Sequence, residues 1–201
     1  MIKIRIIPTM LLKNFGLVKG VNFNSWRRVG TVLPSLNVYN SRDVDELILV
    51  DISATQEHRN FLSENITDVA DNCFIPLTVG GGIDKLDAAK DLIENGSDKI
   101  SINTSIFTNP HVITEIANIY GSQAIVASLD VRKIDDKHIC FSESGNENTK
   151  KNIIDISKKV ESLGAGEILL TSIDKDGTLA GYDYRVLETV SNLVNIPVIA
   201  A

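Results

Sequence analysis

The chain is poor in the residues that build disulfide frameworks, zinc sites and aromatic binding surfaces. Its 201 residues include two cysteines, three histidines and one tryptophan, and aromatic residues make up 5%. Cys73 and Cys140 lie far apart, and neither has a second ligand-type residue at the short spacing that a metal site needs. We therefore expect no metal and no cofactor, and we interpret both cysteines as buried or half-buried thiols.

Excess positive charge and long apolar runs are also missing. The net charge is -6 and the sequence pI is near 5.1, and an excess of carboxylates repels phosphate backbones and anionic membranes. Apolar runs such as 47–50 are far too short to cross a bilayer, and no signal-peptide pattern opens the sequence. We expect a cytoplasmic protein without nucleic-acid or membrane partners, in which backbone amides hold any bound phosphate.

What the chain does have is an internal repeat of about 120 residues. A shift of 121 positions lays 45–51 over 166–172 and 75–79 over 196–200. A shift of 119 positions lays 6–11 over 125–130. This self-similarity predicts two structurally equivalent halves, of which the second stops early.

Short apolar runs alternate with amphipathic stretches along the whole chain. The expected strands are 4–12, 46–52, 76–79, 99–102, 124–130, 167–172 and 197–201, and helical spacing marks 86–93, 110–117, 153–163 and 186–193. Nearly continuous apolar strands are typical of a parallel sheet covered on both faces. With the repeat, this order predicts one (β/α)8 TIM-type barrel over 1–201, built from half-barrels of about 1–121 and 122–201 and C-terminally incomplete after about seven strands. An open doubly wound sheet is the alternative.

Polar residues between 134 and 148 do not fit a core helix. The short run 138–142 has turn residues on both sides, which predicts a β-hairpin inserted after the fifth strand. Such an insertion would lie at the end of the barrel where the loops act.

Glycine and polar residues follow the predicted strands, at the edge where barrels of this class place their active sites. They are Asp51, Gly80-Gly81-Gly82, Asn103-Thr104, Asp130 and Asp176-Gly177-Thr178. The glycine run lets the backbone approach an anion, and we expect the next helix to begin there with its free amides. These positions predict a phosphate cradle, although a tight turn is the alternative for any one of them.

A single carboxylate, Asp130, ends a strand that is otherwise apolar. Burial at such a position raises the pKa of a carboxyl group toward the range useful for proton transfer. We interpret Asp130 as a general acid or base, with a loop cap as the alternative. Its equivalent in the first half is Leu11.

Charged residues open four strands at the opposite end, where apolar side chains would otherwise close the barrel floor. They are Arg5, Glu46, Lys99 and Glu167. Charges this close must pair, so a structural plug of salt bridges is one interpretation. A plug that opens would be a gate.

Four segments carry a family resemblance: 78–83 (TVGGGI), 99–104 (KISINT), 121–124 (GSQA) and 164–174 (GAGEILLTSID). In register, they resemble the cyclase subunit of imidazole glycerol phosphate synthase over essentially all 201 positions. The resemblance implies a barrel that forms a heterodimer with a glutaminase and receives ammonia, released from glutamine, along its axis. It also implies cleavage and cyclisation of a phosphorylated ligand, a ribulosyl bisphosphate imidazole precursor.

The resemblance also assigns residues to roles. It implies a catalytic Asp130, a gate formed by Arg5, Glu46, Lys99 and Glu167, and a glutaminase-facing Asp98 and Gln123. It implies phosphate or substrate binding by Lys19, Asp51, Gly82, Asn103, Thr104, Thr171, Asp176 and Gly177.

One departure from the family pattern changes the expected chemistry. The family pairs Asp130 with an aspartate at the end of strand one, and this chain has Leu11 there. Leucine transfers no proton, and the segment 7–19 resembles instead a paralogue found with surface-polysaccharide genes and thought to supply ammonia for sugar amidation. A genuine histidine-pathway cyclase and a non-catalytic activator of the glutaminase are the alternatives.

Overall fold

The computed structural model describes residues 4–14, 16–61 and 64–201. Backbone packing groups the chain into two compact units. The first comprises residues 1–19 and 27–101, and the second comprises residues 20–26 and 102–201.

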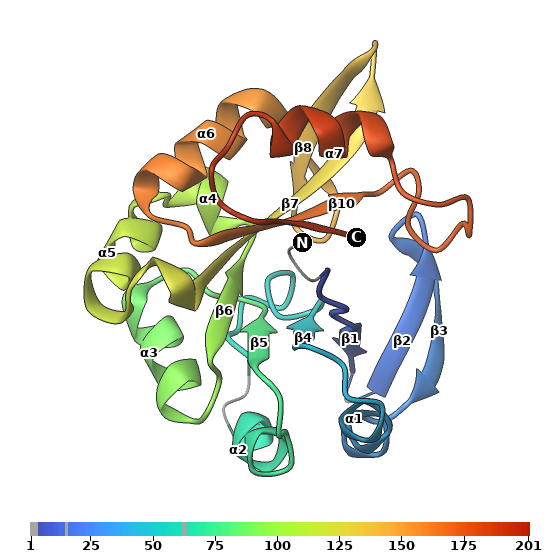
Figure 1. Ribbon diagram of the computed structural model, residues 1–201, viewed down its shortest axis with the longest axis vertical. Helices are drawn as coiled ribbons and strands as arrows, with labels where there is room; N and C mark the ends of the chain where they lie inside the picture. Colours follow the sequence, from blue (N-terminus) through green and yellow to red (C-terminus); the bar gives the residue numbers. More distant parts are fainter. Residues whose placement is uncertain (1–3, 15, 62–63) are drawn as a thin grey trace. The chain divides into compact units, whose positions relative to one another are not determined.

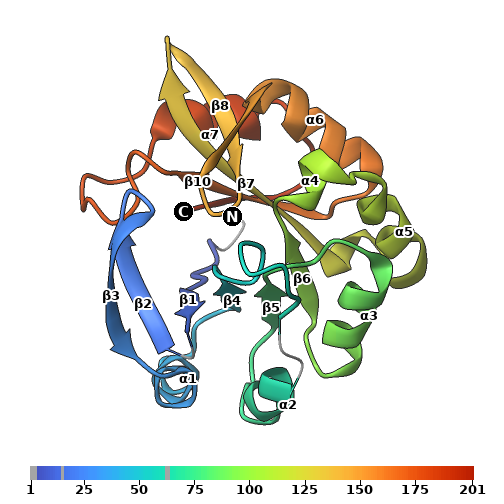
Figure 2. The ribbon, with the colours of Figure 1, turned by 180° about the vertical axis from the view of Figure 1, so that it is seen from behind.

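The first unit is built on parallel strands. β1 (Thr9–Lys13) pairs in parallel with β4 (Leu47–Asp51), β4 with β5 (Leu77–Gly80), and β5 with β6 (Lys99–Ile102). β2 (Gly16–Val21) pairs antiparallel with β1 and leads into β3 (Asn24–Gly30), and residues 20–26 around the turn between them are grouped with the second unit. Helices α1 (Val32–Ser41), α2 (Glu64–Asp71) and α3 (Leu86–Glu94) connect the parallel strands, as Figures 1 and 2 show.

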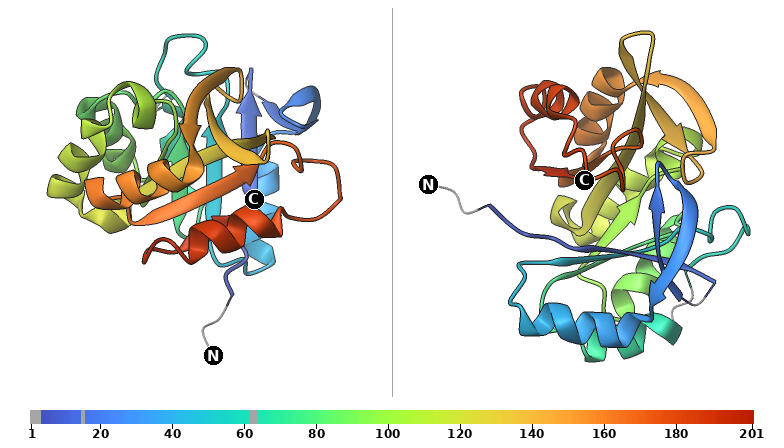
Figure 3. Two further views of the ribbon diagram at one scale, coloured as in Figure 1. Left: turned by 90° about the horizontal axis from the view of Figure 1, so that it is seen from above. Right: turned by 90° about the vertical axis from the view of Figure 1, so that its right-hand side faces the viewer.

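The second unit repeats this plan with an added antiparallel arm. β7 (Ile125–Ile134) and β10 (Glu167–Ser172) pair in parallel, and so do β10 and β11 (Val198–Ala200). The arm is formed by the end of β7 with β8 (Lys137–Ser142) and β9 (Glu147–Asn152). The helices are α4 (Ser105–Thr108), α5 (His111–Tyr120), α6 (Ile153–Leu163) and α7 (Tyr184–Ser191), with a 3-10 turn at Ser122–Ala124. α6 and α7 pack side by side (Figure 3).

Strand register reproduces the sequence repeat. In the first unit Leu11 lies opposite Val50, and in the second Asp130 lies opposite Thr171. These are equivalent pairs under the shifts of 119 and 121 residues. The central strands carry buried apolar side chains on both faces, as the burial of Leu47, Ile48 and Leu49 illustrates.

The fold class is confirmed. Parallel strands alternate with helices in both units, which is the α/β organisation of a TIM-type barrel, and all seven predicted strands are present. The helices expected around 86–93, 153–163 and 186–193 are α3, α6 and α7, and the predicted hairpin is the β7–β8–β9 arm. The expectation of one domain with halves meeting near residue 121 stays a prediction.

Several boundaries differ from expectation. The first strand begins at Thr9 because Ile4 and Ile6 are 87% and 66% exposed and lie outside the sheet. The helix after residue 108 begins at His111 with Pro110 as its N-cap, one position later than the spacing suggested, because Asn109 instead ends the short helix α4. Helix α3 begins at Leu86 rather than at the glycine run. β2, β3 and α1 carry no clear periodicity and were not predicted.

Within the part of the chain that the structure describes, no helix is long and apolar enough to cross a membrane.

Candidate functional site

Asp130 is a buried carboxylate of the second unit. It belongs to β7, where strand pairing on both sides leaves its side chain 7% exposed. Burial raises the pKa of Asp130 to about 7, a hydrogen bond from Thr171 opposes the shift, and the negative charge of Asp176 adds to it. A carboxyl group with a pKa near neutrality can both donate and accept a proton at physiological pH.

Asn103 and Thr104 follow β6 and connect this carboxylate to the arm. The Asn103 side-chain amide donates to the Asp130 carboxylate over 3.1 Å and to the Ser128 carbonyl over 3.0 Å. The Thr104 hydroxyl accepts the backbone N–H of Glu143 over 3.1 Å. The structure thus brings three of the predicted site residues, Asn103, Asp130 and Thr171, into one hydrogen-bonded group.

Asp176 lies on the turn after β10 and is held by a segment that the sequence did not single out. Asn22 donates its backbone N–H to the Asp176 carbonyl over 2.9 Å and its side-chain amide to the Ile173 carbonyl over 2.9 Å. Burial raises the pKa of the Asp176 carboxyl, and a hydrogen bond from the Phe23 backbone opposes the shift. Asn22 and Phe23 both have positive φ, which fits the two-residue turn between β2 and β3. Asn22 is the sequence signal that could have revealed this turn, because asparagine tolerates positive φ better than most residues.

The predicted glycine cradle lies in the first unit and packs closely on the loop that follows β4. Gly81 has φ of +127°, and a Cβ there would lie 2.6 Å from the carbonyl oxygen of Asp51. Gly82 has φ of +69°, and its Cβ would lie 2.1 Å from the carbonyl oxygen of Arg59. Only glycine allows the two segments to approach this closely.

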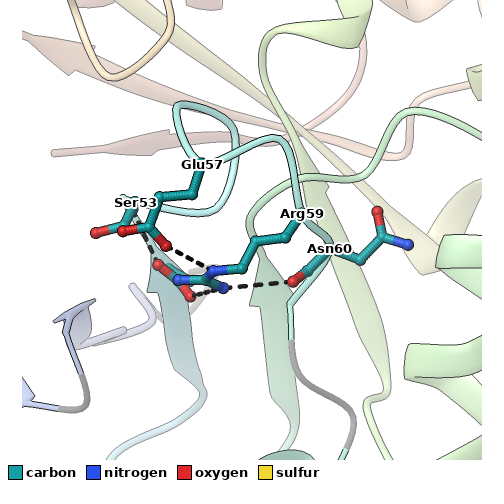
Figure 4. Close-up of polar contacts among 5 residues, drawn as sticks. Ser53, Glu57, Arg59 and Asn60 are labelled. Carbon is teal, nitrogen blue, oxygen red and sulfur yellow. Dashed lines mark hydrogen bonds and ion pairs between the residues drawn. The ribbon is translucent and has the colours of Figure 1, made fainter.

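Asp51, a predicted substrate-binding residue, is buried at the end of β4. Figure 4 shows the polar contacts of the loop that follows this strand, with Ser53, Glu57, Arg59 and Asn60 labelled. One of its carboxylate oxygens accepts the Ser53 backbone N–H over 2.9 Å, and the other accepts Nη1 of Arg59 over 2.7 Å. The Nε of Arg59 also donates to Glu57 over 2.6 Å. The hydrogen bond to Asp51 raises the pKa of the Arg59 guanidinium. Sequence reasoning missed Ser53 and Arg59, because they lie in a loop with no motif.

Three of the four predicted gate residues are together in the first unit. Glu46 is buried and forms ion pairs with Arg5 and, over 2.8 Å, with Lys99. The attraction of the two cations offsets the cost of removing the Glu46 carboxylate from water, although a buried ion-paired group of this kind contributes little net stability. Glu167, the fourth, opens β10 in the second unit and is also buried.

The remaining predicted positions are on the surface. Lys19 is exposed on β2, and Gln123 is exposed in the 3-10 turn, where its amide donates to the Tyr120 carbonyl over 2.8 Å. Asp98 is exposed just before β6, and its carboxylate accepts the Leu77 N–H over 2.7 Å. Gly177 follows Asp176 with φ of +69°. Exposure leaves Asp98 and Gln123 accessible to a partner.

The described residues contain no group of three or more histidine, cysteine or acidic side chains that could hold a metal ion. Cys73 is half-buried, and Cys140 is buried. Burial, together with the negative charge of Asp130, raises the pKa of Cys140 to about 12. A thiol with such a pKa is a poor nucleophile at neutral pH.

Comparison with known proteins assigns the chain to a family. The sequence model of the histidine biosynthesis protein family matches residues 5–201. The chain belongs to the histidine biosynthesis protein family.

Curated relatives narrow the likeness within this family. The chain is 46% identical over 197 residues to the imidazole glycerol phosphate synthase subunit HisF of Chlorobium phaeobacteroides (strain BS1), a match that covers 98% of the chain and 78% of the relative. It is 44% identical over 197 residues to the subunit of the same name from Chlorobaculum tepidum, and this match also covers 98% of the chain and 78% of the relative. The chain is therefore a HisF-like member of the histidine biosynthesis family, and the resemblance read from its four motifs is confirmed at that level.

The stability of this histidine biosynthesis family member should depend on pH through Asp130. Its pKa of about 7 in the folded state lies above the ordinary aspartate pKa of 3.8, so between these values the folded state holds a proton that the unfolded state releases. The free energy of unfolding therefore falls as the pH rises from about 4 to 7 and levels off above that range. Urea denaturation gives the free energy of unfolding at pH 5 and at pH 8. The decrease between these two pH values should be about 3 kcal/mol smaller in Asp130→Asn than in the wild type, at about 1.4 kcal/mol per pKa unit.

An exposed carboxylate on the same arm provides the control for this measurement. Asp136 is fully exposed, and Lys133 lowers its pKa. Asp136→Asn should therefore leave the decrease in the free energy of unfolding between pH 5 and pH 8 unchanged. An equal pH dependence in the wild type and in Asp130→Asn would show that Asp130 titrates as an ordinary surface carboxyl.

Proposed function

We propose that this chain is the barrel subunit of a glutaminase-coupled synthase that passes ammonia to a phosphorylated acceptor, and that it is not a cyclase with two catalytic carboxylates. The observation that carries the proposal is the strand register: Leu11 occupies, beside Val50, the position that Asp130 occupies beside Thr171. The relatives named as synthase subunits support the coupled role.

The ion-paired floor supports ammonia transfer. Glu46 pairs with Arg5 and Lys99. Glu46 directly precedes β4, Lys99 opens β6, and Arg5 lies before β1 rather than in it, so the pairs are opposite the edge that carries Asp51 and the glycine turn. A group of charges that exchanges partners can open a passage wide enough for a small neutral molecule such as ammonia. We assign the gate to these residues together with Glu167, and the partner surface to Asp98 and Gln123.

We assign binding of the ammonia acceptor to residues at the C-terminal ends of the parallel strands. Gly82, Asn103 and Thr104 are proposed to hold one phosphate, and Asp176 and Gly177 to belong to a second site, with Lys19, Asp51 and Thr171 binding the rest of the ligand. We propose a sugar as the acceptor and surface-polysaccharide synthesis in the cytoplasm as the setting, because a sugar amidation needs no second carboxylate in this barrel.

A genuine histidine-pathway cyclase is the second candidate. The identity of 46% to a HisF subunit over 98% of the chain favours it. So does the raised pKa of Asp130, which is about 7 and suits proton transfer by this residue alone or with a substitute acid.

Coupling to a glutaminase is directly measurable. Adding this chain to its cognate glutaminase should raise glutamine hydrolysis at least about tenfold, a change of about 1.4 kcal/mol in barrier, and should give a heterodimer by size exclusion. Asp98→Asn with Gln123→Ala should weaken both effects, whereas Lys90→Gln, an exposed residue of α3 that pairs with Glu94, should change neither. No complex and no stimulation with the wild-type chain would remove the proposed partner.

A further inference from the structure

A phenylalanine side chain is exposed at the N-terminal edge of the sheet in the first unit. Phe74 is 83% exposed and lies in the loop between α2 and β5. Ile4 and Ile6, which are also exposed, precede β1 at the same edge, because β1, β4 and β5 are parallel. Scattered exposed apolar residues are ordinary, but apolar side chains that share one edge indicate a surface for a partner.

The backbone that carries the ring is held by hydrogen bonds to α1. The side chain of Asn40 accepts the Phe74 backbone N–H over 3.4 Å and donates to the Asn72 carbonyl over 2.7 Å. The Cys73 thiol donates to the Ile75 carbonyl over 3.2 Å. An exposed ring on an ordered backbone loses little freedom when it binds, and this favours high affinity.

The segment that carries Phe74 lies between the ion-paired gate and a residue of the proposed partner surface. On one side, the backbone N–H that follows Glu46 donates to the Pro76 carbonyl over 2.9 Å. On the other side, the Leu77 N–H donates to the Asp98 carboxylate over 2.7 Å, and the Asp98 N–H donates to the Leu77 carbonyl over 2.9 Å. A protein that delivers ammonia to this gate must cover the edge that carries Phe74.

The charged groups at this edge of the first unit are negative in sum. Asp71 ends α2 and is exposed, as is Asp98. The loop 42–45 adds two carboxylates and one cation, and the gate adds two cations that are bound to Glu46. Complementary charge steers association, so a partner with basic side chains around an apolar pocket fits this surface.

We propose that Phe74 is the anchor of the glutaminase interface. Its ring enters an apolar pocket of the glutaminase, and lysine or arginine side chains around that pocket face Asp71 and Asp98. The identity of the partner rests on the proposed function. The inference adds that much of the affinity comes from one aromatic contact, whereas the charged side chains set the rate of association.

The affinity of the chain for its cognate glutaminase, measured by calorimetric titration, tests the anchor. Phe74→Ala should weaken binding at least about thirtyfold, which is the effect of losing a hot-spot side chain. Phe74→Leu should fall between Phe74→Ala and the wild type, because leucine keeps part of the apolar volume. The thermal midpoint of both variants should equal that of the wild type, because the side chain is 83% exposed.

Leu179→Ala is the matched control for this titration. Leu179 is 99% exposed, but it lies in the loop after β10, at the carboxyl ends of the strands. The variant removes an exposed apolar side chain of similar size and should bind the glutaminase as the wild type does.

Two further measurements separate the roles of the ring and of the charges. At saturating concentrations of Phe74→Ala, glutamine hydrolysis should reach the wild-type stimulated rate, because the variant loses affinity alone. Asp71→Lys should slow association about tenfold at low salt and much less at high salt, because salt screens exposed charges.

The possible failures are distinct. A stable complex of Phe74→Ala with wild-type affinity would overturn the anchor and leave the proposed glutaminase partner in place. Self-association of the chain that Phe74→Ala abolishes, measured by analytical ultracentrifugation, would assign this edge to a second copy and overturn the inference. A wild-type chain that forms no complex would remove the proposed function and the anchor with it.

Discussion

Replacing Leu11 by aspartate should raise the rate at which this chain converts the ribulosyl bisphosphate imidazole precursor in excess ammonium at high pH. A positioned acid or base contributes about 10² to 10⁴ in rate, which corresponds to about 3–5 kcal/mol of barrier. Leu11 is half-buried at the register position equivalent to that of Asp130, so an aspartate there would restore a carboxylate to each repeat. Ammonium-dependent turnover of the purified chain, without glutaminase, measures the effect.

Leu11→Asn is the matched variant for this measurement. It introduces a polar side chain of the same shape at the same half-buried position, but it has no carboxyl group to transfer a proton. Its turnover should stay at the slow wild-type level. Fast turnover by the wild type, with no further gain in Leu11→Asp, would instead assign the chain to the histidine pathway.

Replacing Gly82 by alanine should lower the free energy of unfolding by about 2–5 kcal/mol. The residue has φ of +69°, and a Cβ would lie 2.1 Å from the backbone carbonyl of Arg59, a contact that no side-chain rotation can relieve. A left-handed backbone costs a non-glycine residue about 1–2 kcal/mol, and overpacking adds about 1–3 kcal/mol or more. Chemical denaturation monitored by circular dichroism gives the difference.

Gly181→Ala isolates the backbone contribution. Gly181 has φ of +78°, close to that of Gly82, but nothing lies within 4 Å of the added Cβ. The variant should therefore cost only about 1–2 kcal/mol. Equal losses in the two variants would mean that the loop after β4 moves away from Gly82 at little cost.

The sequence alone could predict the strands and the carboxylate because both depend on local pattern. Continuous apolar runs mark strands that are buried on both faces, so β4, β5 and β10 were predictable to within about two residues, whereas β7 runs four residues beyond its predicted end into the arm. Asp130 stood out as a charge at the end of such a run, and its burial follows from strand pairing on both sides. The internal repeat alone predicts the equivalence of Leu11 and Asp130.

The loops could not be predicted, because their contacts join residues that no periodicity connects. Arg59 reaches Asp51 across a loop whose shape depends on backbone bonds such as Arg59 N–H to the Ala54 carbonyl. Asn22 reaches the Asp176 carbonyl from a turn that is distant along the chain. Only the folded structure shows that Arg59 contacts Asp51 and that Asn22 contacts Asp176.

The matched register of β1–β4 and β7–β10 has an evolutionary consequence. An aliphatic and an acidic side chain occupy equivalent positions without any change in the pairing of the backbone. A gene for such a protein can therefore lose or regain a reactive group by a single codon change while its product still folds. Selection can then act on chemistry alone, which gives duplicated copies of this barrel a short mutational route between different metabolic roles.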